Sequence, residues 1–214
     1  AFLPRIEDSL PQLEIVDSAR TVEKRYFRDD EEHGQGEHGQ GEHGPEDDDH
    51  DHAGAPDPHV WLGPDAVLEQ IAVIRDELVA LSPGEEELYR DNHQRFAKEI
   101  QALKNELAGY LEPLRGERFY VYHPSFGYFG DTFGLEQVAV ETGGDEPSPA
   151  QLQRIIREAR ADDVSVIFVQ PQFPQSAAER VAEAIDGAVV SVNHLDSDWF
   201  EMMREIAEAL REGV

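Results

Sequence analysis

The chain has 214 residues, of which 39% are hydrophobic, so it is long enough to form one large domain or two smaller domains around an apolar core. Its formal net charge of -28 at pH 7 excludes nucleic acid and anionic membranes as expected partners, because both would repel it, and it favours cations. Because there is no cysteine, disulfides and thiolate ligands are excluded, and any bound zinc must use imidazole and carboxylate ligands.

The first residues show no targeting segment. AFLPRIEDSL has neither the basic start nor the apolar run of a signal peptide, and no apolar run in the chain is long enough to span a membrane. FLPRI predicts a short helix and LEIVD a short strand, which are too small to bury a core by themselves. We therefore expect a processed chain or a fragment, with N-terminal structure missing.

A tract rich in histidine and acidic residues occupies residues 29–57. It contains EHGQG at Glu32 and again at Glu37, then EHGPE at Glu42 and DDDHDH, and it has no Lys or Arg. This low complexity predicts a mobile segment. Its histidines could bind zinc or nickel weakly, and the absence of competing cations favours metal capture over a solvated linker with incidental histidines. The five are His33, His38, His43, His50 and His52.

Two helices are predicted after the tract. Pro64 can begin the first, whose apolar residues recur at helical spacing until Ser82 and Pro83 interrupt the pattern. The second is predicted over about residues 85–111, with one apolar stripe and charged residues elsewhere. A helix of this length can join two domains as a rigid strut, and a coiled-coil dimer stripe is an equally good alternative.

Strands and helices alternate from Gly116 onward. The predicted strands are RFYVYH, LEQVAVE, VSVIFVQ and AVVSVN, and the predicted helices cover residues 125–133, 149–161, 176–185 and 198–210. Ser148 is placed to cap the helix that begins at Pro149, and residues 196–198 are placed to cap the last helix. This alternation predicts an α/β fold with a parallel four-stranded sheet and right-handed crossovers.

Polar residues follow two of these strands. His123 ends RFYVYH, and Asn193 and His194 end AVVSVN, so all three are expected at the carboxyl edge of the sheet, where open α/β folds bind ligands. His123 could instead only tie the strand end to a loop. His59, between the tract and VWL, is a weak signal alone, because such a histidine is more often packed than ligating. We interpret His93 as an ordinary surface residue.

Signatures of common enzymes are missing. The sequence contains no HExxH, GxSxG, P-loop or GxGxxG motif and no cysteine nucleophile. We therefore expect a protein that is not an enzyme, and a zinc hydrolase ranks last among the alternatives.

Five segments of the chain together resemble the ZnuA-like zinc-binding subunits of ABC importers. They are HVWLGPDAV, YHPSFGYFGDTFGL, EPSPAQL, FVQPQF and VVSVNHLDSDW. The resemblance implies two α/β lobes joined by a long rigid helix, with the metal between them. On this basis residues 1–82 form an incomplete first lobe that includes a histidine- and acid-rich loop at 29–58. Residues 83–112 form the linking helix, and residues 113–214 form the second lobe.

The resemblance also implies the metal ligands. His59 and His123 match the family's histidines before the WL pair and at the end of the first strand of the second lobe. A further histidine of the first lobe has no counterpart in this chain. Where the family often has LDPL, this chain has VNHL, so Asn193 replaces an aspartate that may be a ligand. Either His194 or water takes the place of this aspartate as a ligand, or the protein supplies only three ligands.

The resulting hypothesis is a monomeric, periplasmic or otherwise extracytoplasmic protein that captures Zn²⁺ and delivers it to an ABC permease. One alternative is a zinc buffer or metallochaperone whose reservoir is the tract. Another is a manganese-specific protein of the same family, although manganese prefers oxygen ligands.

Overall fold

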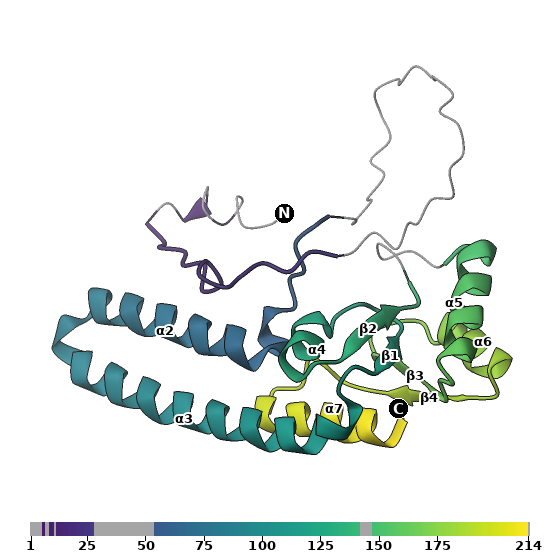
Figure 1. Cartoon of the computed structure of the whole chain (residues 1–214). Helices are drawn as coiled ribbons and strands as arrows, with labels where there is room; N and C mark the ends of the chain where they lie inside the picture. The colour runs from purple at the N-terminus through teal and green to yellow at the C-terminus, as the bar shows by residue number, and fades with distance from the viewer. Residues whose placement is uncertain (1–5, 7–8, 11, 28–53, 142–146, 214) are drawn as a thin grey trace.

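The structure is a computed structural model that describes residues 6, 9, 10, 12–27, 54–141 and 147–213 (Figure 1). The five tract histidines and nearly all of the helix predicted for FLPRI lie outside the described residues.

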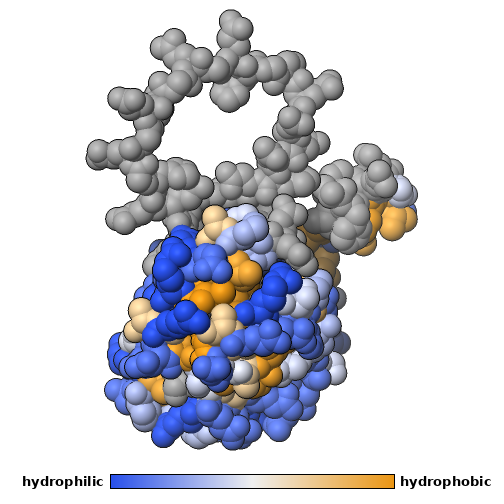
Figure 2. All heavy atoms as spheres, turned by 90° about the vertical axis from the view of Figure 1, so that its right-hand side faces the viewer, coloured by the Kyte–Doolittle hydropathy of each residue, from blue (hydrophilic) through white to orange (hydrophobic). Residues whose placement is uncertain are grey.

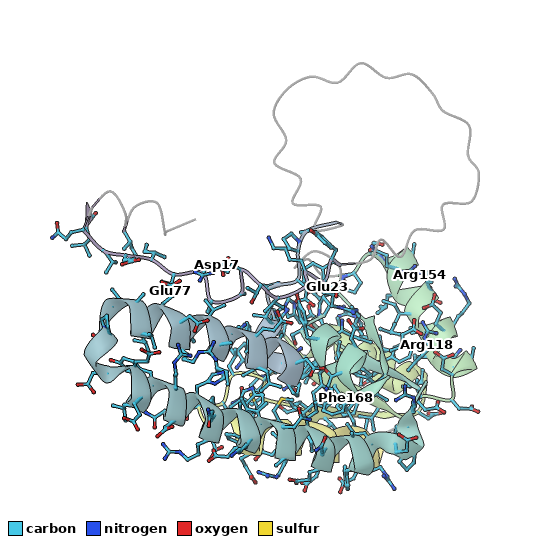
Figure 3. All side chains as sticks on the ribbon, turned by 60° about the vertical axis from the view of Figure 1, so that its left-hand side comes forward. Asp17, Glu23, Glu77, Arg118, Arg154 and Phe168 are labelled. Atoms are coloured by element: carbon cyan, nitrogen blue, oxygen red, sulfur yellow. The ribbon has the colours of Figure 1, made fainter. Side chains whose placement is uncertain are left out.

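The strand predicted for LEIVD is wrong. Residues 13–17 have irregular structure, and the side chains of Leu13 and Ile15 remain 49% and 40% exposed. A strand needs the hydrogen bonds of a neighbour, and no strand of the described part of the chain pairs with this segment. The chain from this segment to Arg20 instead runs along α2 (Pro64–Leu81) (Figure 3). There Arg20 donates a hydrogen bond to Glu77 at 2.6 Å.

A short antiparallel pairing of residues 25–27 with residues 54–57 stands at the two ends of the tract. Tyr26 bridges Pro56, and backbone hydrogen bonds join Phe27 to Ala55 at 3.1 Å and Asp57 to Arg25 at 2.8 Å. We call this pairing the base ribbon. It brings together the two points at which the chain enters and leaves residues 28–53.

The two predicted helices are confirmed as α2 and α3 (Glu86–Leu111), with the turn Pro83–Glu85 between them. They form a long antiparallel pair that extends away from the sheet (Figure 1). The second half of the α3 stripe, from Ile100 to Leu111, is buried and packs against α7 (Trp199–Gly213) of the same chain. The first half is more open, since Leu88 is 52% exposed.

The remaining elements confirm the predicted α/β alternation. They are β1 (Arg118–Val121), α4 (Gly127–Phe133), β2 (Glu136–Ala139), α5 (Pro149–Ala161), β3 (Val166–Val169), α6 (Ser176–Ala184), β4 (Ala188–Ser191) and α7. The four strands are parallel in the order β2-β1-β3-β4. Two predicted caps are also confirmed: Ser148 forms a capping box with Gln151, and Asp198 accepts a hydrogen bond from the Glu201 backbone at 3.1 Å.

Helices cover both faces of the sheet because successive strand residues point to opposite sides. Phe119 and Val121 of β1 face α3, α4 and α7, whereas Tyr120 faces α5 and α6. Figure 2 views the end of the molecule that carries α5 and α6, where hydrophilic residues surround a strip of apolar ones. No helix in the described part of the chain combines the length and apolar character needed to cross a bilayer.

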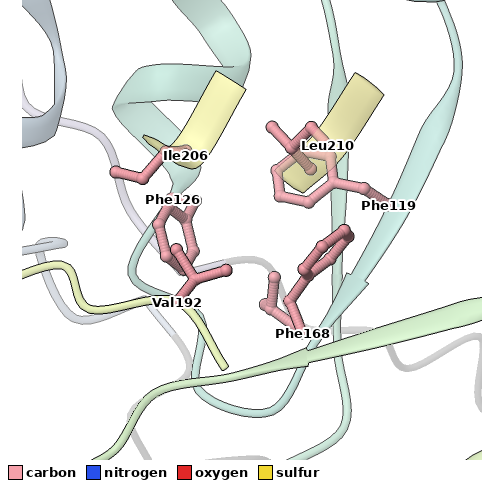
Figure 4. Close-up of a pocket in the computed structure, with 7 residues that line it drawn as sticks. Phe119, Phe126, Phe168, Val192, Ile206 and Leu210 are labelled. Carbon is pink, nitrogen blue, oxygen red and sulfur yellow. The ribbon is translucent and has the colours of Figure 1, made fainter. Parts of the chain in front are cut away.

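A small cavity lies between the sheet and α7 (Figure 4). Its lining side chains are all apolar, so it offers nothing that could bind a cation. They are Phe119, Val121, Phe126, Phe168, Val192, Ile206 and Leu210.

Candidate metal centre

The carboxyl ends of β1 and β4 meet the segment that precedes the short helical turn Val60–Leu62. His59 stands immediately before this turn. The indole of Trp61 donates a hydrogen bond to the His194 carbonyl at 3.1 Å, and the Trp199 indole donates to the Trp61 carbonyl at 2.7 Å. These bonds attach the segment around His59 to the sheet at the edge where His123 and His194 lie.

The Nε2 atoms of His59 and His123 face each other at 3.3 Å. Two nitrogens bound to one tetrahedral zinc ion at about 2.0–2.1 Å are themselves about 3.3–3.4 Å apart. The two rings therefore already have the separation that a shared zinc ion requires.

A buried carboxylate holds the other nitrogen of each ring. His59 Nδ1 lies 2.7 Å from Asp57 Oδ1, and His123 Nδ1 lies 2.5 Å from Glu141 Oε1. A carboxylate only accepts hydrogen bonds, so each Nδ1 is the donor, and in the neutral form of each ring Nε2 then keeps a lone pair. Such carboxylate–histidine pairs fix the tautomer and orientation of metal-binding histidines. In that form the two lone pairs face each other, and a cation between them would relieve their repulsion.

His194 is the third imidazole at this edge. It is 4% exposed, its ring centroid is 6.1 Å from that of His59, and its buried Nδ1 has no hydrogen-bond partner. Burial, and then the proximity of His59 and His123, lowers the pKa of His194 from 6.5 to about 4. The ring is therefore neutral at pH 7 and retains a lone pair without having to lose a proton.

The lowered pKa of His194 predicts acid sensitivity of the metal-free protein. Because the folded state disfavours the charged ring, the stabilising contribution of neutral His194 is complete above pH 6.5 and is lost as the pH falls toward 4. Between pH 7 and pH 5, this residue should account for a loss of about 1–2 kcal/mol of unfolding free energy. Urea unfolding at both pH values should show a smaller loss in His194→Gln. An equal loss in both proteins would contradict the assignment.

Asn193 is placed differently from the histidines. Its Oδ1 accepts hydrogen bonds from Gln172 Nε2 at 3.1 Å and from the Leu195 backbone at 3.2 Å. The structure thus brings His59, His123 and His194 together, whereas the Asn193 oxygen is engaged with the neighbouring loop. No three His, Asp or Glu side chains among the described residues already form a complete metal-binding group. The close pair among them is His59 and His123, and His194 lies farther away.

Sequence reasoning missed three residues that support the pair. Asp57 was indistinguishable from the other acids of the tract. Glu141 and Gln170 follow β2 and β3, so the strand-end argument used for His123 would have found both. Gln170 is fully buried and holds the backbone of His123: its Nε2 donates to the His123 carbonyl at 2.7 Å and its Oε1 accepts from the His123 amide at 3.2 Å.

Aromatic rings surround the three imidazoles. Phe173 stacks on His123 with ring centroids 4.4 Å apart, Trp61 is nearly parallel to His194 at 6.3 Å, and Phe27 meets His59 edge-on at 6.4 Å. These apolar walls restrict ring motion and limit water access, which strengthens electrostatic binding of a cation.

Comparisons with known proteins identify the family of this chain. A family model described as zinc-uptake complex component A, periplasmic (ZnuA), matches residues 2–213. The high-affinity zinc uptake system protein ZnuA of Paracoccus denitrificans is 33% identical over 137 residues, which cover 63% of this chain and 41% of that protein. The zinc-binding lipoprotein AdcA of Streptococcus pneumoniae is 28% identical over 159 residues, covering 71% of this chain and 32% of that protein.

Solved structures show the same fold. A crystal structure of ZnuA matches with a TM-score of 0.84 at 26% identity, covering 99% of this chain and 74% of that chain. A zinc-bound deletion mutant of ZnuA also gives a TM-score of 0.84 at 26% identity, with 99% and 73% coverage. The chain spans about a third to a half of the length of the curated relatives it matches.

Proposed function

Since this chain belongs to the ZnuA family of periplasmic zinc-uptake components, we propose that it captures Zn²⁺ outside the cytoplasm as a monomer and delivers it to an ABC permease. The observation that carries the proposal is the 3.3 Å separation of the His59 and His123 Nε2 atoms. His194, with its buried and unpartnered Nδ1, is the proposed third protein ligand. Water or Asn193, once freed from Gln172, completes the coordination.

The donor set supports zinc rather than manganese. Imidazole nitrogen suits zinc, whereas manganese prefers carboxylate, carbonyl and water oxygens. Here the two buried carboxylates are bonded to His59 and His123 and support the nitrogens instead of replacing them. ZnuA of Paracoccus denitrificans and AdcA of Streptococcus pneumoniae likewise carry zinc in their names.

The same proposal assigns residues 1–82 to the first lobe, 83–112 to the linking helix and 113–214 to the second lobe. In support, α3 falls within the linking part, and all strands of the sheet follow it. The two indole hydrogen bonds of Trp61 and Trp199 attach the segment that carries His59 near the edge of the sheet that carries His123.

The tract is proposed to collect zinc for the cleft. In the sequence, the five tract histidines lie between the two sides of the base ribbon: His33, His38, His43, His50 and His52. The last residue of the ribbon is Asp57, the partner of His59. Ions held weakly by these histidines would be concentrated at the entrance to the site.

Removing the tract separates this function from that of a zinc buffer. Residues 28–53 can be replaced by an Asn-Gly turn, because Phe27 and Gly54 are already joined by a backbone hydrogen bond at 3.3 Å. This design retains Asp57. We expect the variant to keep one tight zinc ion and lose only weak ones, as measured by calorimetric titration. Loss of the tight ion would favour the buffer.

Direct titration tests the proposal. We expect the intact chain to bind one zinc ion tightly and manganese much more weakly, with no turnover of ester or phosphoester substrates when loaded with zinc. A chain that binds manganese more tightly than zinc, or that binds no zinc, would refute the proposal.

A further inference from the structure

Arg25 connects the base ribbon to both halves of the candidate site. Its Nε lies 3.6 Å from Asp57 Oδ2, and its Nη1 donates a hydrogen bond to Asp131 Oδ2 of α4 at 2.5 Å. Its backbone amide donates to the Tyr128 hydroxyl at 3.0 Å, and its carbonyl accepts from the Asp57 amide at 2.8 Å. The residue therefore contacts the segment that carries His59 and the helix that follows His123.

The Asp57 carboxylate needs such a partner. Its side chain is 1% exposed, and its Oδ1 accepts from both the ring and the backbone amide of His59, at 2.7 and 2.9 Å. Its Oδ2 is buried without a hydrogen bond, so the nearby guanidinium supplies the compensating charge. Because the guanidinium faces Oδ2, the carboxylate keeps its other oxygen, Oδ1, hydrogen-bonded to His59.

The Arg25 side chain fits here because residue 127 is a glycine and has no side chain. A Cβ at that position would lie 2.0 Å from Arg25 Nε, so any other residue would displace the guanidinium from its place over the first turn of α4. The Arg25 guanidinium is thus bonded to Asp131 and occupies the space that the missing Cβ of Gly127 leaves free.

We propose that Arg25 is a positioning residue for zinc capture. It does not touch the metal, but it locks Asp57 in the orientation that directs His59 Nε2 toward His123. This role rests on the proposed zinc function. It makes the base ribbon part of the binding machinery, because the chain that leads into the tract also sets the geometry of the first ligand.

Four variants test the role by calorimetric zinc titration. Arg25→Gln removes the charge, and Gly127→Ala keeps the charge but displaces it. Both should weaken zinc binding by about tenfold, the lower end of the effect of losing an outer-shell partner of a metal ligand. Arg20→Gln is the matched control, since Arg20 lies in the same segment and pairs with Glu77 away from the site. The fourth variant is Asp57→Asn.

The decisive readout is the double variant of Arg25→Gln with Asp57→Asn. If Arg25 acts through Asp57, adding Arg25→Gln to Asp57→Asn causes no further loss of zinc affinity. If Arg25→Gln lowers zinc affinity equally in the wild-type and Asp57→Asn backgrounds, its role is merely structural and the inference is overturned. Wild-type zinc affinity in both Arg25→Gln and Gly127→Ala would also overturn it. If Arg25→Gln fails to fold in thermal unfolding, Gly127→Ala carries the test. Absence of zinc binding in the unmodified chain would instead refute the proposed function, and this role with it.

Discussion

Replacing both His59 and His123 with alanine is expected to abolish tight zinc binding. The two Nε2 atoms, 3.3 Å apart, are the donors already arranged for the ion, and no other described side chain is arranged to replace them. Loss of an outer-shell partner alone typically costs up to ~100-fold in affinity, so loss of two ligands should cost more than that. Calorimetric titration against a competing chelator measures the change.

His93→Ala is the control for this experiment. His93 lies on α3 and contacts Arg75 of α2, so its replacement should leave zinc affinity unchanged. An unchanged affinity in the double variant of His59 and His123 would show that the ion binds elsewhere.

Replacing Glu141 with glutamine should weaken zinc binding by about 10–100-fold while the fold is retained. Glu141 is buried and accepts from His123 Nδ1. The neutral amide loses the charge-assisted bond that makes Nε2 a strong donor, and it can turn its NH₂ group toward the ring. Competition titration against a chelator of known affinity measures the loss.

Glu136→Gln is a matched control from the strand that precedes Glu141. Glu136 begins β2 at the opposite end from Glu141, and its side chain is 54% exposed beside Arg118. Its replacement should not change zinc affinity. Equal effects of the two substitutions would mean that Glu141 acts through general surface charge and not through His123.

Much of this architecture could be predicted from local patterns. The apolar runs of β1 to β4 alternate with helices that have clear starts, such as Ser148 before Pro149, and the carboxyl ends of parallel strands must share one edge. His123 and His194 were therefore expected together. The approach of His59 was implied by the family resemblance, because nothing local shows where a loop before VWL will dock.

The parts that could not be predicted depend on contacts between distant residues. LEIVD has strand-like composition but no neighbouring strand in the described part of the chain, so it remains irregular. Asp57 looks like any acid of the tract until His59 is placed against it. Neighbouring residues at a strand end point in different directions, and only the structure shows that Asn193 turns to Gln172 while His194 lies beside His59.

The most direct measurement is an anomalous-scattering map at the zinc absorption edge, from crystals of the chain grown with zinc. Shared coordination predicts one strong peak about 2.0–2.1 Å from the Nε2 atoms of both His59 and His123. A strong peak bound to other side chains, with these two nitrogens facing each other and no ion between them, would contradict it.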